Sequence, residues 1–193
     1  DWEQLFGKDG VGILHLSGLI GALSPDTSRF CLELARAAKK YGTQTGEPLF
    51  LALEKCPDLK IVEPDYSLYV ECSRHFVEVL RSFSPVVEQY SIDEAWVDMT
   101  GTERLFGPPV LAADALRRKV YEELGFTVNV GISDRKVLAK MASDFKKPDL
   151  VHTLFSYEIE EKMWPLTVDN LFMCGHSSVE TLRKLEIITI GDL

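Results

Sequence analysis

The chain has 193 residues, 46% of them hydrophobic, which is enough for one sizeable globular domain with a packed core. A formal net charge of -9 argues mildly against nucleic-acid binding, although a local basic stripe can coexist with that average. No apolar run has the length of a membrane span, and the first residues lack the order of a signal peptide. The four cysteines have no metal-ligand spacing, so we expect reduced thiols in a cytoplasmic protein without membrane contact.

The N-terminal part begins with a predicted strand at residues 12–16, in which His15 is interpreted as a packed strand residue. A helix is expected from residue 35 onward, and Gly42 is suited to its C-terminal cap. Arg36 and Lys39 lie three residues apart on that helix and therefore share one face. Taken alone, they fit an ordinary amphipathic helix with exposed basic residues.

The middle of the chain carries an acidic pair, Asp93 and Glu94, between two strand-like stretches within residues 86–101. A buried carboxylate is costly unless it is paired or holds a cation, so the pair indicates a site for a hard divalent ion such as Mg²⁺. A solvated hairpin tip is the competing interpretation, and it is the commoner one for two adjacent acids. Strand alternation directs Asp98 elsewhere, where it is either capped or solvated in the next turn.

Further helices and strands flank this hairpin. Residues 73–83 and 110–124 have helical periodicity, and residues 126–132 alternate in the manner of a strand. A strand near residues 151–154 would complete the sheet. Two helices packed on these strands indicate an α+β fold of ferredoxin-like type.

A basic amphipathic helix is predicted at residues 137–145, with Ser133 or Asp134 as its N-cap and Pro148 as the residue that ends it. Its apolar residues form one face. Lys136, Lys140 and Lys147 form a narrow stripe on another side of the helix. A stripe of this kind is either a solvated face or a surface that contacts phosphate.

Three motifs, in this order along the chain, resemble those of the Y-family DNA polymerases, the translesion enzymes that copy damaged templates. Residues 35–48 resemble the fingers helix and its turn, residues 90–101 the central palm hairpin, and residues 131–148 the second palm signature. Residues 164–193, with a helix at 178–185, resemble the start of the thumb and its helix-hairpin-helix unit.

The resemblance covers roughly residues 33–193 and implies a ferredoxin-like polymerase palm with a small fingers insertion and the start of a helical thumb. It places the palm at 1–17 and 63–155, the fingers at 18–62 with a shortened or altered start, and a partial thumb at 156–193. The little-finger domain of the family is expected to be absent from this chain.

The implied function is template-directed DNA synthesis during damage bypass, in which deoxynucleotides are added to a primer by two-metal nucleotidyl transfer. Primer-template DNA and deoxynucleoside triphosphates are the implied partners, with a sliding clamp bound through a region outside this chain. The implied location is the cytoplasm of a bacterium, in association with the nucleoid. The residues matched to family roles are Asp93 and Glu94 for two Mg²⁺ ions, Arg36, Lys39 and Lys147 for the triphosphate, and Lys136, Lys140 and Gly175 for DNA.

The start of the chain departs most from the family pattern, in which the first strand ends in a metal-binding Asp followed by aromatics. Residues 17–20, which follow the predicted strand, contain neither. A catalytically impaired, polymerase-like DNA-repair binding module is therefore the alternative, and an unrelated palm-type nucleotidyltransferase or cyclase is a third hypothesis. Lys39 also lacks the bidentate fork of the family arginine, Arg135 replaces an Asn, and His176 replaces a Gly.

Overall fold

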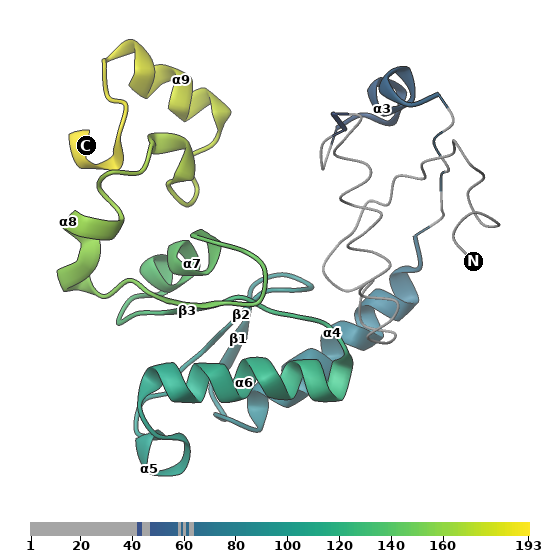
Figure 1. The fold of residues 1–193 in the computed structure, drawn as a ribbon, viewed down its shortest axis with the longest axis vertical. Coiled ribbons are helices and arrows are strands. Elements are labelled where there is room, and N and C mark those ends of the chain that lie inside the picture. The colour runs from purple at the N-terminus through teal and green to yellow at the C-terminus, as the bar shows by residue number, and fades with distance from the viewer. Residues whose placement is uncertain (1–41, 44–46, 58, 60, 62–63) are drawn as a thin grey trace. The chain divides into compact units, whose positions relative to one another are not determined.

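The computed structural model describes residues 42–43, 47–57, 59, 61 and 64–193 (Figure 1). The helices are α3 (Leu49–Lys55), α4 (Tyr66–Arg81), α5 (Glu103–Phe106), α6 (Pro109–Leu124), α7 (Lys136–Asp144), α8 (Ile159–Lys162) and α9 (His176–Lys184). The strands are β1 (Val87–Gln89), β2 (Ala95–Val97), β3 (Val130–Ile132) and β4 (Val151–Thr153), and the 3₁₀ helices are η2 (Ser156–Glu158), η3 (Val168–Asn170) and η4 (Ile190–Asp192). Within these ranges, no helix is both long and apolar enough to span a membrane.

The chain folds as two compact units. Among the described residues, the first unit comprises those up to Val79 together with Gln89–Ala95 and Val120–Phe126. The second unit comprises Leu80–Glu88, Trp96–Lys119 and Thr127–Leu193. The mixture of helices and strands along the described chain agrees with the α+β class predicted from the sequence.

The first unit has a small aromatic and aliphatic core. Phe76 of α4 lies with its ring centroid 6.0 Å from that of Phe126, and Val120 is fully buried. Helix α4 begins at Tyr66, earlier than the predicted start at residue 73. The cause is local, because the Asp65 carboxylate accepts the amide of Leu68 at 3.0 Å and so satisfies a donor at the helix start.

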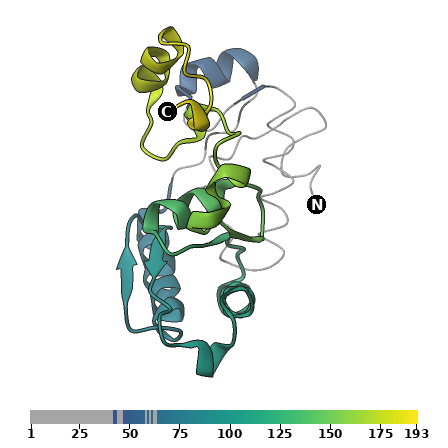
Figure 2. The same ribbon diagram turned by 90° about the vertical axis from the view of Figure 1, so that its left-hand side faces the viewer.

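The hairpin strands β1 and β2 form a two-stranded sheet, seen as neighbouring teal arrows in Figure 2. In the second unit, the amide of Asp98 donates to the carbonyl of Val86 at 3.0 Å. In the first unit, the amide of Tyr90 donates to the carbonyl of Glu94 at 2.9 Å. This pattern is that of an antiparallel pair.

In the second unit, β3 and β4 pair in parallel, with Val130 opposite Val151 and Ile132 opposite Thr153. The predicted strand at residues 126–132 is thus formed only at its end, whereas the strand near 151–154 lies where it was expected. Helix α7 packs directly on β3 (Figure 1). A Cβ added at Gly131 would lie 1.9 Å from the carbonyl oxygen of Ala139, so this close approach requires glycine.

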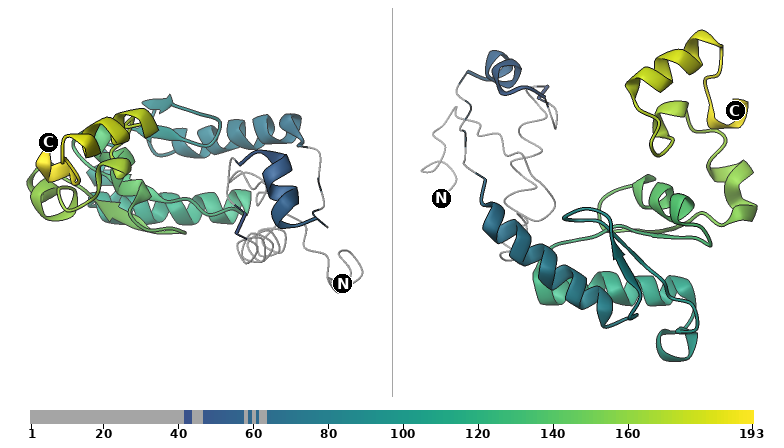
Figure 3. Two further views of the ribbon diagram at one scale, coloured as in Figure 1. Left: turned by 90° about the horizontal axis from the view of Figure 1, so that it is seen from above. Right: turned by 180° about the vertical axis from the view of Figure 1, so that it is seen from behind.

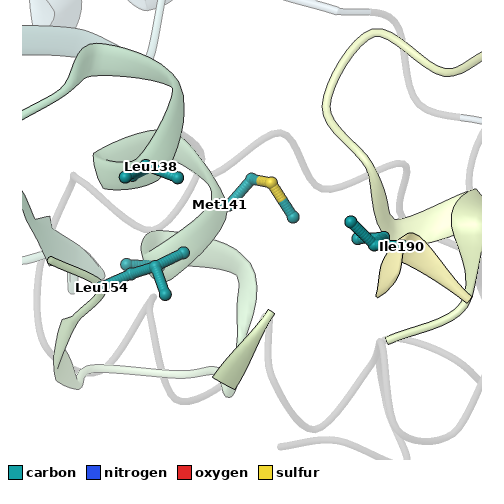
Figure 4. Packing of buried hydrophobic residues seen from close by; sticks show 5 residues of the cluster. Leu138, Met141, Leu154 and Ile190 are labelled. Carbon is teal, nitrogen blue, oxygen red and sulfur yellow. The ribbon is translucent and has the colours of Figure 1, made fainter. Parts of the chain in front are cut away.

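The core of the second unit joins α7 to the C-terminal segment. In Figure 4, the Met141 side chain points toward Ile190, and Leu138 and Leu154 lie beside Met141. Figure 3 shows the chain end returning to the segment after α8. There, the amides of Ile190 and Gly191 donate to the carbonyls of Leu166 and Trp164 at 2.8 and 3.0 Å.

Candidate active site

The acidic pair lies at the end of the hairpin connection, directly before β2. The side chain of Asp93 is exposed and that of Glu94 is half-buried. The amides of Tyr90 and Ser91 both donate to the Glu94 carbonyl, at 2.9 and 3.1 Å. The Ser91 hydroxyl donates to Asp93 Oδ1 at 2.9 Å, so the Asp93 carboxylate is oriented yet open to solvent.

Gln89 ties this connection to α4 within the first unit. Its Nε2 donates to the hydroxyl of the buried Ser73 and to the carbonyl of Ser91, both at 3.0 Å. The backbone under the acidic pair is therefore held by side-chain hydrogen bonds from the strand that precedes it. A carboxylate carried on a fixed backbone is suited to bind a cation without further ordering.

The donor set fits part of a magnesium site. Mg²⁺ is usually bound by one or two carboxylates, with water and substrate phosphates completing the octahedron, and Asp93 and Glu94 supply that number. Among the described residues, no cluster of three or more His, Cys, Asp or Glu side chains forms a metal site. The predicted strand at residues 12–16, where the family carries its first acid, lies outside the described residues, as do Arg36 and Lys39.

Asp98 has a separate, local role in the second unit. Its Oδ1 accepts the amide of Thr100 at 2.9 Å, and bonds from the hydroxyl and amide of Thr100 hold the pKa of Asp98 below its ordinary value. Both alternatives left by the sequence therefore hold, because Asp98 is hydrogen-bonded within the turn and is also exposed to solvent.

The basic helix α7 starts at Lys136, and its N-cap residue is Arg135, which makes no side-chain capping bond. The predicted caps Ser133 and Asp134 were wrong. The Ser133 hydroxyl instead donates to the Leu154 carbonyl at 2.5 Å, and Asp134 accepts the hydroxyl of Ser156 at 2.8 Å. Both side chains are used to join the segment before α7 to the segment after β4.

Lys136 is held by a three-residue cluster in the second unit. Its ammonium group pairs with the carboxylate of Glu88 and lies 5.6 Å from the centroid of the Trp96 ring. The indole Nε1 of Trp96 donates to the backbone carbonyl of Lys136 at 3.1 Å. These contacts join the first turn of α7 to the hairpin strands.

Lys140 and Lys147 share one carboxylate. Each ammonium nitrogen lies 2.8 Å from an oxygen of Asp144, but the Lys140 side chain is 15% exposed whereas that of Lys147 is 61% exposed. Burial alone would raise the pKa of Asp144, but the hydrogen bonds from the two lysines outweigh burial and lower it. Of these two cations, Lys147 is the one more exposed to solvent.

Gly175 is the N-cap of α9 and makes no side-chain capping bond. Its carbonyl accepts the amide of Val179 at 3.0 Å, as expected at a helix start. The neighbouring His176 side chain is 90% exposed, with Nδ1 3.7 Å from a carboxylate oxygen of Glu180. The His176 side chain therefore lies in solvent at the start of α9.

The predicted site residues that the structure describes are divided between the two units. Lys136, Lys140, Lys147 and Gly175 belong to the second unit, whereas Asp93 and Glu94 belong to the first. Sequence reasoning missed Asp144 as the carboxylate shared by two lysines. The i, i+4 spacing of Lys140 and Asp144 was the available signal.

Adjacent carboxylates on a hairpin, followed by a lysine-bearing helix packed on a strand pair, are features of a polymerase palm. The sequence model of the impB/mucB/samB family matches residues 19–144, more than half of the chain. The chain therefore belongs to this family of Y-family DNA polymerases.

Relatives agree with that assignment. DNA polymerase IV of Clostridium acetobutylicum is 42% identical over 193 residues, which is 99% of this chain and 48% of that protein. DNA polymerase IV of Alkaliphilus oremlandii is 43% identical over 155 residues, covering 80% of this chain and 39% of that protein. The chain thus spans about half the length, or less, of these curated relatives.

Solved structures confirm the predicted fold class. The crystal structure of DinB from Sulfolobus solfataricus matches 81% of this chain with a TM-score of 0.72 and 26% identity, over 46% of that chain. The insertion ternary complex of Dbh DNA polymerase matches the same share with a TM-score of 0.72 and 27% identity, also over 46% of that chain. The described α+β architecture is that of a Y-family polymerase core.

Proposed function

We propose that this chain forms part of a translesion-type DNA polymerase, which adds deoxynucleotides to a primer under the direction of a template. The observation that carries the proposal is the Asp93–Glu94 pair, presented on a hydrogen-bonded hairpin connection with the Asp93 carboxylate open to solvent. The names of the relatives, and a solved ternary complex of a structural neighbour, support the same reaction class. The proposed location is the bacterial cytoplasm, at the nucleoid.

In this proposal, Asp93 and Glu94 would hold Mg²⁺, and the complete site would contain two such ions. When bound, such ions activate the primer hydroxyl and neutralise the charge of the triphosphate and its leaving group. Ser91 contributes by orienting the Asp93 carboxylate through its 2.9 Å hydrogen bond. Gln89 contributes by holding the connection that carries both acids.

The triphosphate is bound by Lys147, together with Arg36 and Lys39, the basic pair of the fingers helix predicted from the sequence. Lys147 exchanges its 2.8 Å contact with Asp144 for a phosphate oxygen, and Lys140 keeps Asp144 paired when it does so. The Asp144 carboxylate is therefore not left without a cation after the exchange, which lowers the cost of releasing Lys147.

The DNA backbone is contacted by Lys136 and by the backbone amides that follow Gly175 at the start of α9. The Lys140 side chain is mostly buried and paired with Asp144, so it contributes to DNA binding chiefly by keeping the Asp144 carboxylate paired.

The proposed domain boundaries are a palm at 1–17 and 63–155, fingers at 18–62 and a partial thumb at 156–193. A sliding clamp is a further proposed partner, bound through a region outside this chain.

The second candidate function is a DNA-repair binding module without catalysis. The observation that favours it is the lack of an acid in residues 12–20, where the family places its first metal ligand. The two functions differ in whether a carboxylate from residues 1–30 reaches Asp93.

Primer extension with Mg²⁺ and four deoxynucleotides tests the proposal. The intact chain is compared with Asp93→Ala and Glu94→Ala, and Asp98→Asn is the matched control because Asp98 is a turn acid of the same hairpin. Extension by the intact chain and the control, lost in the other two variants, supports the polymerase. DNA binding without extension by any of the four proteins favours the binding module.

A further inference from the structure

The turn between α7 and β4, residues 145–150, is fixed by side chains from outside it. Asn129, directly before β3, makes most of these contacts. Its Nδ2 donates to the carbonyls of Ser143 and Lys146 at 2.9 and 2.7 Å. Its Oδ1 accepts the amide of Leu150 at 3.1 Å. One half-buried amide side chain thus satisfies three backbone groups on both sides of the turn.

Two more side chains hold the same turn. The ring Nε2 of His152 lies 3.1 Å from the Lys146 carbonyl, so this carbonyl has one side-chain partner from β4 and one from the residue before β3. Arg117 of α6 pairs with the Asp149 carboxylate at 2.6 Å. The backbone is thereby anchored immediately before Lys147 and two residues after it.

Lys147 is one of two exposed lysines in this anchored turn, the other being Lys146. The Nζ of Lys147 reaches Asp144 at 2.8 Å with 61% of the side chain exposed. The lysine stem is long and flexible, so the range of its ammonium group depends on how firmly its own backbone is held. The apolar face of α7 is already packed by Leu138, Met141 and Ala142, so the Asn129 contacts add order specifically to the turn.

We propose that Asn129 is a positioning residue that holds Lys147 where it can bind the triphosphate of the incoming nucleotide. That the ligand of Lys147 is the triphosphate of a nucleotide rests on the proposed function. That Asn129 positions Lys147 rests on the Asn129 hydrogen bonds. The proposal assigns to Asn129 an effect on nucleotide binding exerted through Lys147, without contact between Asn129 and the nucleotide. Preorganising a binding group in this way increases affinity by removing an ordering cost.

The kinetic test compares the intact chain with Asn129→Ala, using Asn170→Ala as the matched control. Asn170 is an exposed amide of the same unit, and its Nδ2 donates to the carbonyl and hydroxyl of Thr167 within its own turn. Asn129→Ala is expected to raise KM for the deoxynucleotide about tenfold while kcat changes less than about twofold. In a Lys147→Ala background, the same substitution should add less than about twofold. Equal effects on kcat and KM, or fully additive effects, would overturn the proposal.

A second readout does not need activity. Because Lys147 helps to lower the pKa of Asp144, NMR titration of that carboxyl reports whether Lys147 is in place. Asn129→Ala should raise the pKa of Asp144 toward the value in Lys147→Ala, and Arg117→Met, which releases Asp149, should shift it in the same direction. An Asp144 pKa unchanged in both variants would overturn the inference. Absence of primer extension by the intact chain would instead refute the proposed function, and the titration would still decide the role of Asn129.

Discussion

At Gly131, the fold of the second unit leaves no room for a side chain. A Cβ added there would lie 1.9 Å from the carbonyl oxygen of Ala139, 2.6 Å from the amide nitrogen of Ser143 and 3.0 Å from the carbonyl carbon of Ala139. All three atoms are backbone atoms on the α7 side, so no rotamer change can relieve the overlap. Helix α7 as a whole would have to move away from β3.

Gly131→Ala should therefore cost at least the upper end of the usual overpacking range, about 3 kcal/mol of unfolding free energy. For a chain of this size, such a loss lowers Tm by about 6–12 °C. Urea unfolding followed by circular dichroism, together with a thermal scan, measures both quantities. Gly175→Ala is the control, since a Cβ at Gly175 has no neighbour within 4 Å and should cost less than about 1 kcal/mol as a cap substitution. A Gly131→Ala variant as stable as that control would refute the packing of α7 on β3.

Three further outcomes are expected. Leu154→Ala should lower the unfolding free energy in urea by about 2–5 kcal/mol, because Leu154 is fully buried beside Leu138; a loss under about 1 kcal/mol would contradict this core. Because the folded-state pKa of Asp144 lies below its ordinary value of 3.8, its ion pairs stabilise the protein above that pH, and the contribution is lost as pH falls through the folded-state pKa. Urea midpoints at pH 7 and pH 3 should therefore differ less in Asp144→Asn than in the parent chain, and equal differences would contradict the pairing. Ser91→Ala should weaken Mg²⁺ binding by removing the hydroxyl that orients Asp93, as measured by calorimetry, and unchanged affinity would argue against that role.

Local sequence patterns predicted the helices best. The helix expected at 110–124 is found at Pro109–Leu124, and the one expected at 137–145 at Lys136–Asp144, because their apolar periodicity coincides with a buried face. The hairpin was also located correctly, with the acidic pair in the connection between its two strands. For the early start of α4, the signal was Asp65 three residues before Leu68.

Features that depend on distant partners could not be predicted. Residues 126–132 have strand character throughout, yet pairing starts only at Val130, since the Asn129 side chain is used by the turn after α7. Lys136 and Lys140 were correctly placed on one helix, but Lys147 lies beyond the end of that helix, in the turn that follows it. The pairing of Lys136 with Glu88, and of Lys140 and Lys147 with a shared Asp144, depends on contacts that spacing does not determine fully. Ser133 and Asp134 have the composition of caps but bind partners beyond β4 instead.

The most direct test of a polymerase palm is single-turnover incorporation of one deoxynucleotide into a primed template with Mg²⁺, by the intact chain and by Asp93→Ala. The proposed function predicts incorporation by the intact chain and a loss of about 10³-fold or more in the variant, as expected when an electrostatic catalytic group is removed. Equal incorporation by both proteins would contradict the assignment of the catalytic site to the hairpin acids. No incorporation by the intact chain, with DNA still bound, would favour the binding module over the polymerase.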